Sequence, residues 1–246
     1  MEGTTRARGR DASGETDKID ESDNAEGSVV IELSLGDRGL EVLCLGAHPD
    51  DIEIGCGGTL IRLAERADVR VTAVVLTGEG RRAAETTDAL PRFVASAKVE
   101  TLGLADGRLP SQWGEAKQAL EDVAGRCDPD IVFAPRLDDA HQDHRLVGEL
   151  ARTVWRDALI LHYEIPKWDG DLGAPTHFVA LTEEQARRKV ELLNDCFPSQ
   201  VARDWWDDEL FLGLMRIRGV ECRARYAEAF FSAKVVLDLA DTGGAA

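Results

Sequence analysis

Short apolar runs alternate with longer segments of helical spacing along most of the chain. Runs typical of buried strands lie at 41–46, 69–76, 131–134, 158–163 and 178–181, and a last one lies at 234–239. Apolar residues with helical spacing lie at 57–67, 92–102, 115–126, 144–157, 183–196 and 205–218. This alternation is typical of βαβ units, so we expect an α/β fold in which a mostly parallel sheet is flanked by helices.

The ends of the chain differ from this alternating region. Residues 1–28 are polar and contain too few large apolar residues to offset the entropy of ordering. We therefore expect a disordered leader at 1–28, one Rossmann-like three-layer domain at 29–240 and a flexible tail at 241–246. The first residues lack the apolar core of a signal peptide, and no run approaches the ~18 apolar residues of a membrane span. These features favour a cytoplasmic protein that does not enter a membrane.

The charge of the chain narrows the classes of partner. It carries 46 acidic against 29 basic residues, a formal net charge of −17. Nucleic acids and membrane surfaces attract Lys and Arg, so this charge disfavours both and favours a small-molecule substrate. The five cysteines are widely spread and form no CxxC pair, which indicates neither a disulfide framework nor a cysteine zinc site. Assembly into a homo-oligomer stays open.

Two segments rich in His and Asp follow predicted strands. AHPDD at 47–51 follows the strand at 41–46, and PRLDDAHQDH at 135–144 follows the strand at 131–134. In open α/β sheets, ligands bind beyond the carboxyl ends of the strands, so both segments lie where chemistry is expected. Imidazole and carboxylate together suit Zn²⁺ or a similar divalent ion. Each segment alone also fits an ordinary turn in which Asp caps a helix.

The two segments resemble the signatures of a known family. AHPDDIEIGCGGTL at 47–60 is similar to the first motif of the PIG-L/LmbE-like zinc-dependent N-acetyl-sugar deacetylases, and DAHQDHRLVG at 139–148 is similar to the second. Weaker likenesses are LTGEG at 76–80, ADGRL at 105–109 and YAEAF at 226–230. The resemblance covers about residues 40–237 of the chain.

This resemblance implies roles for the residues of the first motif and the end of the second. His48, Asp51 and His144 would bind Zn²⁺. Asp50 would be the general base that removes a proton from the attacking water. A carboxylate suffices for this, because the metal lowers the pKa of the water that it binds.

The same resemblance implies roles for four further residues. His141 would stabilise the oxyanion, as a cation or as a neutral donor, and Asp143 would orient His141 and favour its protonated form. Arg92 and Asp106 would contact substrate. Arg92 lacks the Glu that often follows it in the family and also fits a solvated helix surface. Asp106 fits an Asp-Gly turn equally well.

Other residues have a structural interpretation. His162 falls inside a predicted strand and is expected to be an ordinary core histidine. Glu53 is expected to support the metal loop. The glycines at 55, 57 and 58 do not form a nucleotide motif, and close backbone packing explains them better.

The sequence thus predicts a zinc hydrolase that removes the N-acetyl group from an N-acetylglucosamine-type sugar or conjugate. Hydrolysis of another amide in specialised metabolism is one alternative. An Fe(II)-dependent oxygenase is a second, because His48-x-Asp50 with a distant histidine also fits a facial triad. Such oxygenases use a jelly roll, which the helix-rich pattern disfavours. A sugar or nucleotide binder without catalysis is a third, disfavoured because the predicted metal site is complete.

Overall fold

The structure is a computed structural model that describes residues 33–36 and 38–237. The predicted leader at 1–28, the ends of the predicted domain at 29–32 and 238–240, and the predicted tail at 241–246 lie outside the described residues. The strands are β1 (Leu40–Gly46), β2 (Val69–Thr77), β3 (Ala97–Leu104), β4 (Ile131–Pro135), β5 (Leu159–Tyr163), β6 (His177–Leu181) and β7 (Tyr226–Phe231). The helices are α1 (Asp51–Leu63), α2 (Gly80–Phe93), the short 3-10 helix η1 (Leu109–Gln112), α3 (Trp113–Ala124), α4 (Gln142–Val154), α5 (Glu183–Cys196) and α6 (Asp208–Glu221).

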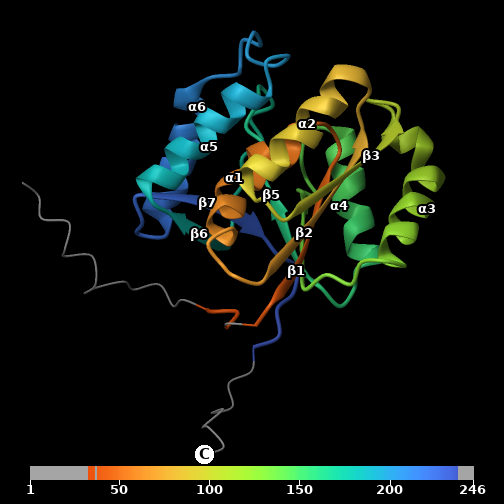
Figure 1. The fold of residues 1–246 in the computed structure, drawn as a ribbon, viewed down its shortest axis with the longest axis horizontal. Helices are drawn as coiled ribbons and strands as arrows, with labels where there is room; N and C mark the ends of the chain where they lie inside the picture. The colour runs from red at the N-terminus through yellow and green to blue at the C-terminus, as the bar shows by residue number, and fades with distance from the viewer. Residues whose placement is uncertain (1–32, 37, 238–246) are drawn as a thin grey trace, which may run out of the picture. The chain divides into compact units, whose positions relative to one another are not determined.

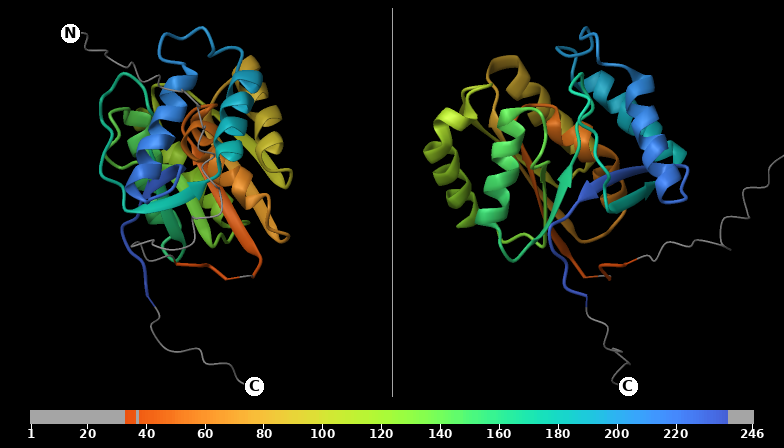
Figure 2. Two further views of the ribbon diagram at one scale, coloured as in Figure 1. Left: turned by 90° about the vertical axis from the view of Figure 1, so that its left-hand side faces the viewer. Right: turned by 180° about the vertical axis from the view of Figure 1, so that it is seen from behind.

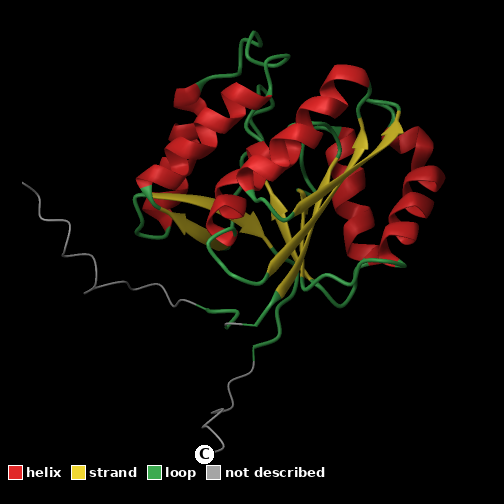
Figure 3. Ribbon diagram, viewed as in Figure 1, coloured by secondary structure: helices red, strands yellow, loops and turns green. Residues whose placement is uncertain are grey.

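The strands form one seven-stranded sheet of order β3-β2-β1-β4-β5-β7-β6. The first five strands in this order pair in parallel, whereas β7 is antiparallel to both β5 and β6. The expected mostly parallel sheet flanked by helices is therefore confirmed (Figure 3). The central strand β1 is apolar on both faces, as a parallel strand covered from both sides must be.

Helices cover both faces of this sheet and create two separate cores. On one face, α1, α2, α5 and α6 pack over a large cluster that includes Phe133, Tyr163 and Phe230. On the other face, α3 and α4 pack over a smaller cluster that includes Leu45, Leu120 and Val147. Figures 1 and 2 show these layers from opposite sides, with α3 and α4 next to each other.

The sheet has one point at which its winding reverses. From β1 the chain proceeds to β2 and β3 in one direction, and it then returns to β4 and β5 on the other side of β1. The connections therefore leave the carboxyl ends of β1 and β4 toward opposite faces, which leaves a crevice between them. The two segments rich in His and Asp follow these two strands.

Glycine in α1 allows close packing below that crevice. A Cβ on Gly55 would lie 2.2 Å from Tyr163, one on Gly57 would lie 2.7 Å from Phe93, and one on Gly58 would lie 2.5 Å from Leu181. The predicted close packing of these glycines is confirmed. We expected this helix to begin at 57, but it begins at Asp51, because tertiary packing outweighs the low helix propensity of glycine.

Two other sequence predictions are wrong. Residues 92–102 were expected to be helical, but α2 ends at Phe93 and β3 forms the sheet edge from Ala97. Edge strands are half exposed, and the charged residues of β3 hide its strand character. The strand expected at 234–239 is absent from its described part, 234–237, and β7 pairs with β5 and β6 in its place.

Candidate metal centre and active site

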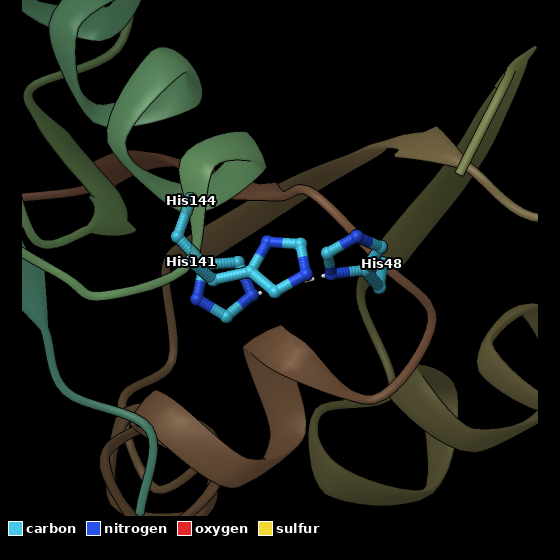
Figure 4. A group of neighbouring side chains, drawn as sticks. All are labelled: His48, His141 and His144. Atoms are coloured by element: carbon cyan, nitrogen blue, oxygen red, sulfur yellow. Dashed lines mark hydrogen bonds between the residues drawn. The ribbon is translucent and has the colours of Figure 1, made fainter. Parts of the chain in front are cut away.

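Three histidines meet in the crevice between β1 and β4. His48 follows β1 by two residues, His141 is the N-cap of α4, and His144 lies in the first turn of that helix. The centroids of their rings are 4.7–5.1 Å apart. Figure 4 shows His141 and His144 extending from α4 toward His48, so two segments almost a hundred residues apart form one cluster.

Polar atoms of the three predicted metal ligands lie within 3.4 Å of one another. Nδ1 of His48 lies 3.2 Å from Nε2 of His144. Asp51 Oδ1 lies 3.3 Å from His144 Nε2, and Asp51 Oδ2 lies 3.4 Å from His48 Nδ1. Two atoms bound to one tetrahedral Zn²⁺ at ~2.0–2.1 Å are separated by roughly 3.3 Å, so these spacings match a shared metal.

The second nitrogen of each imidazole faces a carboxylate. His48 Nε2 lies 3.2 Å from Asp143 Oδ2, and His144 Nδ1 lies 3.0 Å from Asp139 Oδ1. Metal-bound histidines almost always direct their remaining N–H to such an acceptor, which fixes the tautomer that leaves the other nitrogen free for the metal. His48 therefore has the surroundings of a metal ligand, and His144 has a carboxylate within reach, although its Nδ1 makes no hydrogen bond.

Burial and charge support the same assignment. Asp51 is fully buried, and its Oδ1 has no hydrogen-bond partner, while its Oδ2 accepts hydrogen bonds from the backbone N–H groups of Ala47 and His48. Burial opposes ionisation of Asp51, but His144 and His48 hold its pKa well below the usual value. A buried carboxylate oxygen without a partner is costly unless a cation satisfies it, so the residues fit a divalent metal.

The charges around His48 and His144 favour a cation. Burial disfavours the charged form of His48, but Asp51, Asp106 and Asp143 raise its pKa to about 11. His144 is likewise buried, and Asp51 and Asp139 raise its pKa to about 9. The surrounding carboxylates thus hold positive charge on the imidazoles, and a dication binding there would displace those protons.

A second grouping of His48, Asp106 and Asp143 fits a metal less well. The carboxylate of Asp143 accepts hydrogen bonds from the backbone N–H groups of Gly107 and Leu109, so its oxygens are already satisfied. Asp106 is 55% exposed in its side chain. These two carboxylates are better described as acceptors for His48 Nε2.

Asp50 lies beside the proposed ligands in an unusual backbone conformation. Its φ is 102° and it precedes α1, a left-handed conformation that costs a non-glycine residue of order 1–3 kcal/mol. It is 2% exposed, and its Oδ1 has no hydrogen-bond partner. Burial and the adjacent Asp51 raise the pKa of Asp50 to about 6. A carboxylate of this kind is ionised at neutral pH and can readily accept a proton.

Arg82, which was not predicted from the sequence, completes this part of the site. Arg82 Nη2 lies 3.3 Å from Asp50 Oδ2 and donates to the carbonyl oxygen of Pro49 at 2.9 Å. Its Nη1 lies 3.4 Å from Asp106 Oδ2. A signal was available, because Arg82 follows the LTGEG segment at the carboxyl end of β2, the same sheet edge as the other site residues.

The predicted partnership of His141 with Asp143 is not present. The Asp143 carboxylate faces His48 and the backbone of Gly107, while its backbone N–H donates to His141 Nδ1 at 3.3 Å. Burial and the two neighbouring histidines lower the pKa of His141, so the expected protonated form is not favoured in this arrangement. With Nδ1 acting as an acceptor, the ring proton of neutral His141 lies on Nε2.

The two predicted substrate residues behave differently. Asp106 joins the site, with Oδ1 at 3.2 Å from His48 Nε2. Arg92 does not, because it lies at the far end of α2, is exposed, and pairs with Asp195 at 3.0 Å. Glu53 is fully buried and accepts a hydrogen bond from Thr86. This contact connects α1, which follows the His48 segment, to α2, as expected of a supporting residue.

The described part of the chain contains no helix long and apolar enough to cross a membrane.

Residues 43–155, which include all the residues of the histidine cluster and its surroundings, match the sequence profile of the PIG-L family, described as GlcNAc-PI de-N-acetylase. The chain is also 35% identical over 175 residues to the uncharacterized deacetylase YaiS of Escherichia coli strain K12. That match covers 65% of this chain and 92% of YaiS.

Solved structures share the same fold. The N,N'-diacetylchitobiose deacetylase of Pyrococcus horikoshii is 23% identical, with a TM-score of 0.61 over 78% of this chain and 83% of that one. The 4-carboxy-2-hydroxymuconate hydratase GalB of Pseudomonas putida is 20% identical, with a TM-score of 0.67 over 82% of this chain and 100% of that one. A deacetylase and a hydratase thus use one architecture, and the side chains of the crevice must decide the chemistry.

Proposed function

Because this chain belongs to the PIG-L family of deacetylases, we propose that it hydrolyses the N-acetyl group of an N-acetylglucosamine-type sugar or sugar conjugate with a bound Zn²⁺. The observation that carries the proposal is the buried triad of His48, Asp51 and His144 with Asp50 at its side. The family description and the diacetylchitobiose deacetylase support an N-acetylated sugar as substrate.

His48, Asp51 and His144 would hold the metal. Zn²⁺ bound there supplies a Lewis acid for the acetamide carbonyl and makes water easier to deprotonate. The chain adds carboxylates around these ligands, since Asp143 contacts His48 Nε2 and Asp139 lies beside His144 Nδ1.

Asp50 acts as the general base. Its buried carboxylate, ionised at neutral pH, takes a proton from the water that attacks the carbonyl carbon. Asp50 then gives this proton to the nitrogen as the C–N bond breaks. The products are acetic acid, which ionises to acetate, and the free amine, so one water is consumed and no redox step is needed.

His141 acts as the electrophile for the developing oxyanion. Its Nδ1 accepts from the backbone N–H of Asp143, which leaves Nε2–H as a donor. A neutral donor in a water-poor site stabilises negative charge that develops only in the transition state. In this proposal Asp143 positions His141 through its backbone and His48 through its carboxylate.

Substrate would approach from the exposed side of the cluster. Arg82 and Asp106 border that side, with side-chain exposures of 31% and 55%. A guanidinium and a carboxylate there can bind the hydroxyl groups of a sugar ring. Other acetamides are the alternative substrates for the same reaction, because the metal centre would contact only the acyl group.

Acetate release from a panel of N-acetylglucosaminides tests the proposal. We expect zinc-loaded protein to release acetate and amine in equal amounts. Release from other acetamides but from no sugar would move the substrate to the alternative. Iron-dependent turnover with oxoglutarate would instead support an oxygenase, which the parallel sheet disfavours because those enzymes are jelly rolls.

A further inference from the structure

A second cavity lies away from the metal centre, at the opposite end of α4. It has a volume of about 220 Å³ and lies where the end of α4, strand β5 and the segment after β7 meet. Its lining includes Arg152, Arg156, His162 and Lys234. The 13 residues of α4 span about 20 Å, so this cavity is separate from the crevice at the N-terminus of the helix.

Three cations border the cavity. Arg152, Arg156 and Lys234 line it, and no carboxylate does. Arg156 Nε donates to the carbonyl oxygen of Thr153 at 3.2 Å, and Lys234 Nζ donates to that of Arg156 at 2.7 Å. Within the part of the chain that the structure describes, none of the three forms an ion pair. Such a cluster is unusual in a chain with a net charge of −17, and it creates a local site for an anion.

His162 also lines this cavity, and one of its ring nitrogens is unpaired. It is 2% exposed, and its Nδ1 pairs with the carbonyl oxygen of Pro135 at 2.8 Å. Its Nε2 is buried and has no hydrogen-bond partner. The expected role as an ordinary core histidine therefore accounts for only one of its two ring nitrogens.

The tautomer of His162 determines which kind of hydrogen-bonding group its unpaired Nε2 can contact. Since a carbonyl oxygen can only accept, Nδ1 carries the proton and donates to Pro135. Burial lowers the pKa of His162, and Arg152 acts in the same direction, whereas the Pro135 carbonyl and Asp138 oppose the shift, so the neutral ring is favoured. Nε2 is then an acceptor, and it needs an O–H or N–H donor from a ligand.

We propose that this cavity binds a small oxyanion that also carries an O–H group, such as inorganic phosphate or a phosphorylated sugar. The three cations bind the oxygens, and Nε2 of His162 accepts a hydrogen bond from the hydroxyl. The volume is below the ~300–1,000 Å³ of pockets that enclose drug-sized ligands, which favours an anion of phosphate size.

Calorimetric titration of the full chain with inorganic phosphate at constant ionic strength tests this proposal. We expect saturable binding of one phosphate per chain near neutral pH. Sulfate has a similar shape but no O–H, so it should bind about tenfold more weakly or less, because Nε2 then lacks a donor. Equal affinity for the two anions would overturn the role of His162.

Substitution of the arginines that line the cavity tests where phosphate binds. Replacing both exposed arginines, Arg152→Gln with Arg156→Gln, should weaken phosphate binding about tenfold or more, since two charge-assisted contacts are lost. Arg188→Gln makes a matched change on an exposed arginine of α5 and should have no effect. Phosphate binding that persists in the double variant lies elsewhere, for example at the metal centre, and contradicts the proposal, as does the absence of binding.

A hexose 6-phosphate distinguishes two sources of the oxyanion. Tighter binding than phosphate, lost in the double variant, identifies a phosphorylated sugar whose hydroxyl reaches His162. Binding of phosphate alone identifies the free ion. Acetate release by the double variant should equal that of the unaltered protein, which separates this site from the proposed catalytic function.

Discussion

Arg82 Nη2 lies 3.3 Å from Asp50 Oδ2, so the first turn of α2 contacts the proposed general base. The same guanidinium lies between Asp50 and Asp106, because its Nη1 is 3.4 Å from Asp106 Oδ2. Arg82 is one of the cationic groups that lower the pKa of Asp50, against the larger opposing effects of burial and Asp51. The arginine thus connects the base with the exposed side of the site.

We predict that Arg82→Gln shifts the pH dependence of kcat/KM, so that activity is lost at a higher pH on the acid side of the profile. Removing the guanidinium takes away a charge that favours ionised Asp50, so the carboxylate is protonated over a wider range of pH. The loss of a charge-assisted contact should also lower kcat/KM about tenfold at neutral pH. Acetate release measured across pH checks both effects.

Arg81→Gln is the matched control. Arg81 is the preceding residue of α2, but it pairs with Glu85 at 3.1 Å and is 67% exposed. Its profile should overlay that of the unaltered protein. A shift of equal size in both variants would mean that general charge, and not contact with Asp50, causes the shift.

Asp50→Asn should abolish most turnover and leave the metal bound. Removal of a general base costs about a hundred- to ten-thousand-fold in rate. Asparagine tolerates a positive φ well, so the φ of 102° at this position should be retained. Acetate release together with zinc content per chain measures the two properties separately. An active Asp50→Asn enzyme would exclude Asp50 as the base.

The location of the site was predictable from sequence because it depends on strand order along the chain. His48 and His144 follow the buried apolar strands β1 and β4, and the carboxyl ends of parallel strands lie at one edge. The position of Arg82 depends on how α2 is oriented on the sheet, which no local pattern specifies. The family resemblance placed Arg92 in the site, whereas Arg82, a few turns earlier in α2, is the arginine that reaches it.

The direction of the Asp143 side chain also required the structure. The family resemblance implied a pair with His141, but the carboxylate accepts from the backbone N–H groups of Gly107 and Leu109. Those donors come from the loop after β3, a strand that was expected to be helical. A single error in secondary structure therefore hid the residues that orient this carboxylate.

Removal of the metal should lower the thermal stability of the protein. Without a cation, Asp51 Oδ1 is buried without a partner, and two imidazole nitrogens face each other at 3.2 Å. A ligand that binds only the folded state raises stability by about 2.7 kcal/mol at a hundred times its dissociation constant. We expect chelation to lower the Tm and added Zn²⁺ to restore it.

Asp51→Asn should remove this response to zinc, because the neutral amide is a poor ligand. Asp138→Asn is a suitable control, since Asp138 is 77% exposed and pairs with Arg136 outside the triad. A protein whose Tm responds to zinc equally in both variants would place the metal elsewhere.

Glu53 should make the stability of the metal-free protein depend on pH. Burial raises the pKa of Glu53 from 4.5 to about 8, so the folded protein binds a proton that the unfolded chain releases at lower pH. The stabilising contribution is complete below pH 4.5 and is lost as pH rises through about 8. The slope from this group is at most about 1.4 kcal/mol per pH unit.

Glu53→Gln should flatten that part of the profile, because the amide stays neutral and keeps an acceptor for Thr86. Denaturant unfolding at several pH values measures the slope. Glu115→Gln, on the exposed surface of α3, should leave it unchanged. An unchanged slope in Glu53→Gln would show that Glu53 is ionised in the folded protein.

The same substitution at two helical glycines should have opposite effects on stability. In Gly55→Ala the new methyl would lie 2.2 Å from the ring of Tyr163, whose hydroxyl donates to the carbonyl oxygen of Leu45 at 2.6 Å. This ring is fully buried between α1 and the sheet and has no space to move, so we expect a loss of about 1–3 kcal/mol or more. In Gly213→Ala the methyl meets no heavy atom within 4 Å, and the higher helix propensity of alanine should stabilise α6 by up to about 1 kcal/mol. Urea unfolding of both variants measures the two free energies. If Gly55→Ala were as stable as Gly213→Ala, α1 would not depend on close approach to Tyr163, and glycine would have no packing role beneath the metal loop.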